Sequence, residues 1–374
     1  MLIRPLRAVT RPSLCPLCHT RLVSTLPARP AKKSARATTL TPPSIDLSAL
    51  LANPALAKKN LIDRAYPLAA SVVDDIARLE LEASALRNEL QRARERRNAA
   101  SAAGAREEGR EIKVLLKRLE GELATRATTL DALALQLPNT SHPSSPIGDE
   151  SAARTIRTFG PSIPTPAPPA TPALDHLHLS SPAHLSWTDF PSSSLISGPS
   201  WPLLTNTGAL LELALTSYAI STATSRGFAP VLPPDVVRAD VAERCGFHPR
   251  DGDAQQTYFL SDGTVGGDTS LVLVGTAEVP LVAMSAAMTY REDELPIRRV
   301  GLGRAFRAEA GARGAESRGL YRVHQFSKVE MVVVCAEEDS GRILEELRSV
   351  QEQILGSLGL SLRSVPAAFG ASAS

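Results

Sequence analysis

The sequence predicts an α+β fold with an antiparallel sheet, preceded by an antiparallel coiled-coil hairpin arm. Two features of the 374-residue chain lead to this prediction: a long region of regular apolar spacing, and a later region in which short strands alternate with helices but no βαβ repeat is visible. A chain of this length is expected to form two or more domains. We divide it into four parts: a leader (1–45), an arm (46–137), a Pro-rich connector (138–182) and a mixed α and β domain (183–374).

The leader is basic and free of acids. Before the first acid, Asp46, the chain carries eight cationic residues, which are Arg4, Arg7, Arg11, Arg21, Arg29, Lys32, Lys33 and Arg36. The remainder then holds 33 basic and 39 acidic residues, so the positive excess belongs to the leader. This composition is typical of a mitochondrial transit peptide and predicts the mitochondrial matrix, the alternative being a disordered basic tail. The sequence has no run of about 18 apolar residues, so neither a transmembrane helix nor a membrane partner is expected.

The leader also contains Cys15-Pro-Leu-Cys18-His19, a spacing shared with c-type haem attachment and with half of a zinc site. No second CxxC follows, so we interpret the spacing as coincidence and predict no protein metal site. Cys245 and Cys335 are isolated and are expected to be small buried residues.

The arm is predicted from its heptad pattern. The apolar residues of its first half are spaced 4, 3, 4, 3 and 4, and they are Val72, Ile76, Leu79, Ala83, Leu86 and Leu90. The stretch 98–109 interrupts the pattern, which resumes at Ile112 and continues to Leu137 with Arg126 at a seam position. Neither helix can bury its stripe alone, so an antiparallel pair is expected, ended by Pro138.

The end of this hairpin is basic, with ten cations and five acids between Arg87 and Arg118. A protruding basic arm can contact the phosphates of a nucleic acid, whereas a solvated charged face needs no partner; both interpretations stay open on composition. The candidate nucleic-acid-binding residues are Arg92, Arg94, Arg96, Arg97, Arg110, Lys113 and Lys117.

The connector has closely spaced prolines from Pro161 to Pro169 and is expected to be extended or disordered. In the following region we predict helices at 208–226 and 337–358. The predicted strands are 228–234, 271–274, 297–302 and 329–334.

The segment 301–334 predicts a β-hairpin with chemistry on it. Residues 305–309 alternate apolar and charged, which places Arg307 and Glu309 on one face of a strand. A loop rich in Gly and Arg follows, and a second alternating strand returns through Lys328 and Glu330. Arginine is suited to bidentate contact with phosphate, so the loop can close over an anionic ligand. The alternative is a surface hairpin with scattered ion pairs.

These residues resemble the seryl-tRNA synthetases of class II. Phe306-Arg307-Ala308-Glu309-Ala310-Gly311, the string from Arg318 to Phe326 and Lys328-Val329-Glu330 are similar to motif 2 of that family. Gly275-Thr276-Ala277-Glu278 is similar to its serine-binding segment, and the stretch 208–234 to motif 1. The resemblance extends over about residues 46–360.

The resemblance implies a class II synthetase fold and a two-step reaction in mitochondrial translation. L-Serine would attack ATP, with Mg²⁺ on the phosphates, to give seryl-adenylate, and tRNA(Ser) would then accept the seryl group. It also implies a homodimer formed through motif 1.

The resemblance further assigns roles to residues. Arg307 would be catalytic, since it would hold the α-phosphate. The implied ATP-binding residues are Arg307, Ala308, Glu309, Val323, Phe326 and Arg318. Those implied for serine are Thr276, Ala277, Glu278 and Glu330. We interpret His324 as a packed, hydrogen-bonded histidine.

The sequence departs from the family at its end. It reads Phe369-Gly370-Ala371-Ser372-Ala373-Ser374 and then stops, so we expect a chain truncated before the motif 3 arginine. Two alternatives stay open: a catalytically impaired synthetase-like protein that binds RNA or protein, and an amino-acid:carrier ligase. The basic hairpin argues against the second.

Overall fold

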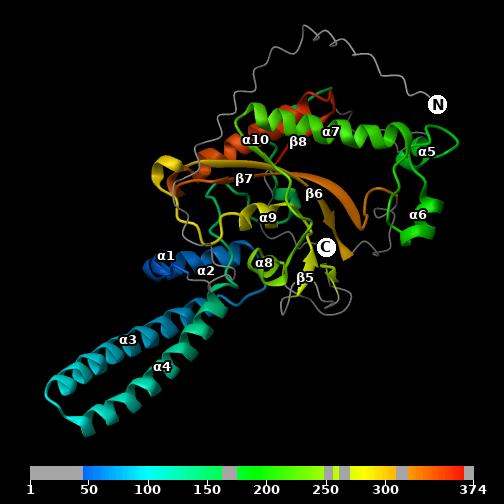
Figure 1. The fold of residues 1–374 in the computed structure, drawn as a ribbon. Coiled ribbons are helices and arrows are strands. Elements are labelled where there is room, and N and C mark those ends of the chain that lie inside the picture. Colours follow the sequence, from blue (N-terminus) through cyan, green and yellow to red (C-terminus); the bar gives the residue numbers. More distant parts are fainter. Residues whose placement is uncertain (1–44, 162–174, 248–255, 261–269, 309–318, 366–374) are drawn as a thin grey trace, which may run out of the picture. The chain divides into compact units, whose positions relative to one another are not determined.

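The computed structural model describes residues 45–161, 175–247, 256–260, 270–308 and 319–365 (Figure 1). The predicted leader lies almost wholly outside these ranges, as do Glu309, Arg318 and the last nine residues. Within the described ranges, no helix has both the length and the hydropathy needed to cross a membrane.

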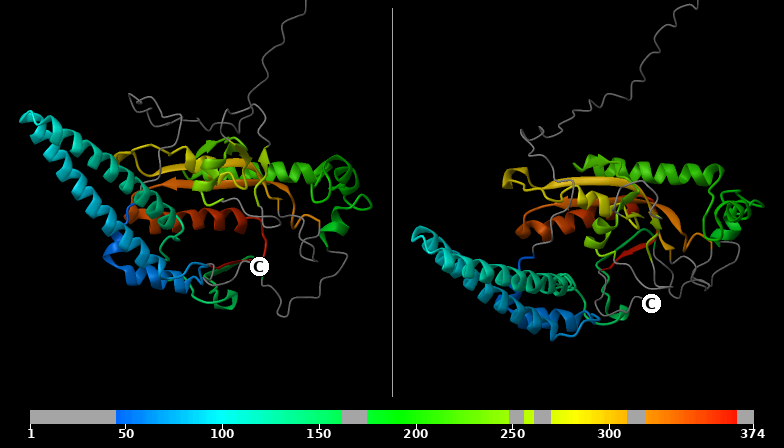
Figure 2. Two further views of the ribbon diagram at one scale, coloured as in Figure 1. Left: turned by 90° about the horizontal axis from the view of Figure 1, so that it is seen from below. Right: turned by 60° about the horizontal axis from the view of Figure 1, so that its bottom comes forward.

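The arm is an antiparallel pair of helices, α3 (Val72–Ala102) and α4 (Arg106–Ala134), which lie side by side in every view (Figures 1 and 2). Leu90 and Ala93 of α3 pack against Ile112, Leu116 and Leu119 of α4, and all five are buried. The predicted hairpin is therefore confirmed.

The turn of the arm is shorter than predicted. Helix α3 continues into the expected interruption at 98–109 and ends at Ala102, so only residues 103–105 separate it from α4. Alanine-rich sequence favours helix, so only Gly104, at φ +72°, is needed for the reversal. The seam residue Arg126 is accommodated by an ion pair of 2.9 Å with Glu82 of the opposite helix.

Two short helices, α1 (Ser48–Ala52) and α2 (Pro54–Asp63), precede the arm. Asn60 of α2 is buried and binds the chain that leaves α4: its amide donates to Asn139 O (3.0 Å) and its oxygen accepts from Ser141 N (3.1 Å). This pairing explains how the chain is held where Pro138 ends the hairpin.

The described part of the connector contains regular structure, whereas the closely spaced prolines from Pro164 to Pro169 lie outside the described residues. The described part includes a 3₁₀ turn, η1 (Glu150–Ala152), and a strand, β1 (Arg157–Phe159). Helix α5 (His176–Ser180) begins within the same stretch. Strand β1 pairs antiparallel with β8 (Leu362–Ser364), so a partner distant in sequence supplies the order that local composition could not reveal.

The main sheet has the strand order β2-β6-β7. Strands β6 (Ile297–Phe306) and β7 (Gln325–Val334) form an antiparallel ladder of ten pairs. Strand β2 (Ala229–Val231) runs parallel to β6, which is a departure from the predicted antiparallel pattern. A second sheet, in the order β3-β5-β4, joins Val236–Arg238, Leu271–Leu273 and Phe259–Leu260.

Helices cover both faces of the β6–β7 ladder (Figure 1). On one face, α7 (Asn206–Ser225) and α10 (Ser340–Gly356) pack on Val300, Val329 and Met331. On the other face lies α9 (Glu278–Ala283). The remaining elements are α6 (Phe190–Ser197), α8 (Ala239–Arg244), η4 (Glu292–Glu294) and η7 (Glu337–Asp339).

A two-pronged ion pair fixes α10 to the sheet. The Arg298 guanidinium donates from Nε and Nη2 to the two oxygens of Glu346, at 3.0 and 2.9 Å. These bonds hold the pKa of the Glu346 carboxyl below its usual range, so the pair remains charged at neutral pH.

Candidate functional site

One face of the β6–β7 ladder combines small residues with chemically active ones. Side chains alternate along a strand, so every second pair of the ladder lies on this face. Three of these pairs join a small β6 residue to a larger β7 residue: Gly301 with Glu330, Gly303 with Lys328, and Ala305 with Phe326. At these three pairs the β6 side chains are small, so the larger β7 side chains extend beyond them.

The glycines allow the segment before α9 to rest directly on the strand. A Cβ at Gly303 would lie 3.0 Å from Ala277 Cβ, and one at Gly301 would lie 2.9 Å from Leu281 Cδ1. Ala277 and Leu281 are both buried. The close approach brings Thr276 over the β7 side chains.

Thr276, Lys328 and Glu330 form a hydrogen-bonded cluster. Thr276, only 4% exposed, donates from Oγ1 to Glu330 Oε1 at 2.7 Å. Lys328 Nζ lies 2.6 Å from the same oxygen and 3.4 Å from Thr276 Oγ1. Glu330 is thus held by two donors from separate segments, and its carboxylate orientation is fixed. Sequence reasoning assigned no role to Lys328, although its position two residues before Glu330 on one strand placed both on one face.

Glu278 is the first residue of α9 and is exposed, and its backbone N–H lies 3.3 Å from Thr276 Oγ1. Burial and then the Glu278 carboxylate raise the pKa of the nearby Cys245 thiol. Cys245 is therefore a neutral, partly buried thiol, in agreement with its predicted role as a small packing residue.

Arg307 follows β6 directly instead of lying within a strand, because the ladder ends at the pair Phe306–Gln325. Its guanidinium lies 5.1 Å from the centre of the Phe326 ring, and the residue is exposed. A cation over a half-buried aromatic ring suits a ligand that has both a planar ring and negative charge.

The predicted site residues are therefore only partly described. The structure brings Arg307 to Phe326 and Thr276 to Glu330, and both pairs belong to one face of the ladder. Ala308 N donates to Gln256 O at 3.1 Å, and Val323 is half-buried beside His324. His324 is packed and hydrogen-bonded, as predicted. Arg322, which sequence reasoning did not assign, adds an exposed cation on the returning side of the hairpin.

The arm presents its cations in two groups. Arg94 pairs with Glu120 at 3.2 Å, and Arg96 with Glu108 at 3.7 Å. The other five predicted residues are exposed and form no ion pair with any residue in the described ranges: Arg92, Arg97, Arg110, Lys113 and Lys117.

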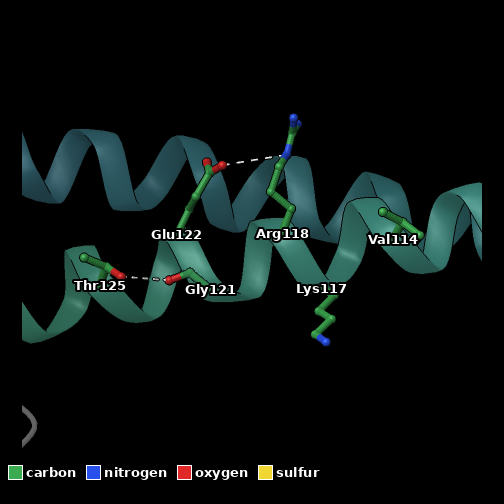
Figure 3. A pocket seen from close by; sticks show the side chains of 6 residues that line it. All are labelled: Val114, Lys117, Arg118, Gly121, Glu122 and Thr125. Carbon is green, nitrogen blue, oxygen red and sulfur yellow. Dashed lines mark hydrogen bonds and ion pairs between the residues drawn. The ribbon is translucent and has the colours of Figure 1, made fainter.

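Figure 3 shows the outer side of α4, where Gly121 leaves a shallow hollow of about 510 Å³. Arg118 points toward Glu122, its partner at 3.7 Å, whereas Lys117 points to the opposite side (Figure 3). The hollow is lined by one helix alone, so it is a feature of an open surface and not an enclosed site.

Among the residues that the structure describes, no group of three or more His, Cys, Asp or Glu side chains is placed to bind a metal ion.

Known proteins share this architecture. Residues 264–373 match the family model described as tRNA synthetase class II core domain (G, H, P, S and T). The serine–tRNA ligase of Rubrobacter xylanophilus is 35% identical over 333 residues, which are 86% of this chain and 75% of that protein. The chain belongs to the serine–tRNA ligase family.

Other members of the family agree. The mitochondrial serine–tRNA ligase of Schizosaccharomyces pombe is 36% identical over 71% of this chain. The crystal structure of seryl-tRNA synthetase from Pyrococcus horikoshii complexed with ATP has a TM-score of 0.73, 29% identity and coverage of 88% of this chain and 78% of that one. The predicted class II α+β fold with its helical arm is confirmed. The chain spans 55% of the length of the S. pombe protein and 60% of that of the Treponema denticola serine–tRNA ligase.

The close approach at Gly303 yields a prediction. Gly303→Val should lower the free energy of unfolding by about 1–3 kcal/mol, because the added side chain has no room against Ala277. Thermal or urea unfolding measures the effect.

Gly341→Val is the matched control, since no atom lies within 4 Å of a Cβ there. Equal stability of the Gly303 variant and the wild type would show that the 276–278 segment does not rest on β6.

Proposed function

We propose that this protein activates L-serine with ATP and transfers the seryl group to tRNA(Ser). The observation that carries the proposal is the shared face of the β6–β7 ladder, where the Arg307–Phe326 pair and the Thr276–Lys328–Glu330 cluster lie together. The first suits a nucleotide and the second suits an ammonium group. Membership of the serine–tRNA ligase family supports the same reaction.

In the first step, a serine carboxylate oxygen forms a bond to the α-phosphorus of ATP, and the bond to the pyrophosphate oxygen breaks. Arg307 stabilises the negative charge that builds up on the α-phosphate. The adenine ring stacks on Phe326, while Ala308, Glu309 and the Val323 backbone complete its binding. Arg318 contacts the pyrophosphate end. No side-chain nucleophile takes part, so catalysis rests on positioning and charge.

Mg²⁺ enters with ATP, bound to its phosphates. Its proposed role is to neutralise part of the charge of these phosphates.

The serine pocket is formed by Thr276, Ala277, Glu278 and Glu330. Glu330 accepts from the serine ammonium, and the fixed carboxylate gives the contact a defined direction. Ala277, buried against Gly303, keeps the pocket small. A small pocket with carboxylates suits a small amino acid with a free ammonium.

In the second step, a hydroxyl of the terminal ribose of tRNA attacks the activated carbonyl carbon, and AMP leaves. We propose that residues 46–137 form the tRNA-binding arm and that residues 183–374 belong to the catalytic domain. The exposed cations Arg92, Arg97, Arg110, Lys113 and Lys117, together with Arg94 and Arg96, contact the tRNA backbone.

Helix α7 supports a homodimer. Four of its leucines are exposed: Leu210 (64%), Leu213 (63%), Leu211 (44%) and Leu215 (41%). Such an apolar surface is typical of a contact with another chain, and we propose that α7 meets its copy in a second protomer.

The acid-free leader supports import into the mitochondrial matrix, and two of the similar ligases bear the description mitochondrial. We propose a role in mitochondrial translation.

Serine-dependent ATP–pyrophosphate exchange tests the reaction. It is measured on the chain of 374 residues and on a chain extended through the downstream coding sequence. Thr276→Val removes the hydroxyl that donates to Glu330 and orients its carboxylate toward serine. Because a hydrogen bond to a charged group contributes about 1.5–3 kcal/mol, the KM for serine should rise by about tenfold or more. The KM for ATP should stay constant.

Thr276→Ser keeps the hydroxyl and is the matched control. Absence of serine-dependent exchange in both chains would contradict the reaction, and an unchanged KM for serine in Thr276→Val would contradict the pocket.

The proposed binding of tRNA by the arm is tested by removing positive charge from it. Arg92→Gln/Arg97→Gln should weaken tRNA binding and reduce the slope of log affinity against log salt by about 0.7–0.9 for each phosphate that the arm no longer neutralises. Filter binding across a salt series measures both quantities.

Arg78→Gln/Arg87→Gln removes the same charge from α3 at residues already paired with Asp75, Glu82 and Glu80, and it should have a smaller effect. Equal reductions in the two double variants would point to nonspecific electrostatics and against a defined tRNA-binding surface.

The dimer is tested on α7. Leu210→Glu/Leu213→Glu should shift the protein to monomer in sedimentation velocity, because charges cannot be buried without partners. Leu81→Glu, at an arm residue that is 73% exposed, is the control and should leave the assembly unchanged. A dimer that survives both α7 substitutions would rule out this interface.

A further inference from the structure

His324 holds both backbone polar groups of Arg307. The Arg307 N–H donates to His324 O at 3.0 Å, and His324 Nδ1 lies 2.9 Å from Arg307 O. Residue 307 is the first after the ladder ends, so no further strand pair fixes it. These two bonds extend the order of the ladder by one residue, to the residue that carries the guanidinium.

Two oxygen atoms converge on His324 Nδ1, the carbonyl of Arg307 and the hydroxyl of Tyr258. A carbonyl oxygen can only accept, so the bond to Arg307 O requires a proton on His324 Nδ1. The Tyr258 hydroxyl oxygen lies 2.7 Å from the same nitrogen and is then a second acceptor of that proton. Burial raises the pKa of Tyr258, so its hydroxyl stays neutral.

The imidazole is itself held from several sides. The Trp201 ring stacks on it at 5.3 Å with an interplanar angle of 28°, and His324 N donates to Ser200 O at 2.9 Å. Two residues before Tyr258, Gln256 O accepts from Ala308 N at 3.1 Å. The segments around 200 and 256 thus hold the His324 ring and the backbone after Arg307 in one arrangement.

We propose that His324 is a positioning residue for Arg307, with its Nδ1–H fixing the Arg307 carbonyl and Tyr258 and Trp201 fixing the ring. The consequence for catalysis rests on the proposed function, because Arg307 would act on the phosphate. A long side chain such as arginine reaches one place reliably only when its backbone is fixed, and small misplacements of reacting groups are costly.

Two amide substitutions separate the donor from the bulk of the ring. The side-chain nitrogen of His324→Asn can take the place of Nδ1, whereas that of His324→Gln takes the place of Nε2. We expect His324→Gln to lower kcat of serine-dependent exchange by about 10- to 100-fold, and His324→Asn to retain most of it. The KM for serine should be the same in both, since Thr276 and Glu330 are untouched.

A second measurement does not depend on the reaction. Hydrogen–deuterium exchange of the backbone amides of Arg307 and Ala308 should be faster in His324→Gln than in the wild type and in His324→Asn. Tyr290→Phe removes a hydroxyl that is bonded to Ser285 and not to His324, and it is the control, with exchange close to wild type. A purely structural role would instead change the thermal midpoint of both amide variants alike, with no difference at residues 307 and 308.

The outcomes separate the two proposals. Equal kcat and equal amide exchange in the Asn and Gln variants would overturn the positioning role while leaving the proposed function intact. A wild-type protein without serine-dependent exchange would overturn the proposed function. The amide measurement alone would then decide the positioning role: faster exchange only in His324→Gln supports it, and equal exchange overturns it.

Discussion

The antiparallel ladder between β6 and β7 separates side chains into two sets, and the rest of the described structure around it depends on this separation. Pairs such as Val300–Met331 face α7 and α10 and form a core, whereas Gly303–Lys328 and Ala305–Phe326 face the segment before α9. A one-residue slip of register would exchange the two sets and place Lys328 in the core. The buried apolar face thus fixes the position of every polar residue on the other face.

The polar face depends on the small size of three β6 residues, Gly301, Gly303 and Ala305. Gly301 and Gly303 let Ala277 and Leu281 approach the strand, and this approach brings Thr276 within 2.7 Å of Glu330. The donors around Glu330 thus come from a loop and a strand far apart in sequence. Beyond the last pair of the ladder, hydrogen bonds to His324 hold the backbone of Arg307.

Much of this was predictable from local pattern. The heptad spacing predicted the arm, and alternation predicted the hairpin and the common face of Lys328 and Glu330. The sequence did not reveal the parallel pairing of β2 with β6 or the antiparallel pairing of β1 with β8, because both join residues far apart in the chain. The turn of the arm was placed too broadly, since alanine continues a helix until Gly104 permits reversal. The hydrogen bonds from His324 to the Arg307 backbone depend on Trp201 and Tyr258, which contact the His324 ring. No local motif in the sequence connects these two residues to His324. The roles of Glu309 and Arg318 stay predictions.

One face of the β6–β7 ladder packs on α7 and α10, whereas the other is proposed to bind ATP. ATP titration calorimetry can distinguish the two faces. Phe326→Ala removes a side chain from the polar face, and Val333→Ala removes one from the face that packs on α7 and α10. Phe326→Ala should weaken ATP binding by about tenfold, since stacking of a base on an aromatic ring contributes about 1–3 kcal/mol. Val333→Ala should leave the affinity unchanged while lowering stability. Undiminished ATP affinity in Phe326→Ala, or an equal reduction in Val333→Ala, would show that ATP binding does not depend on the polar face of the ladder alone.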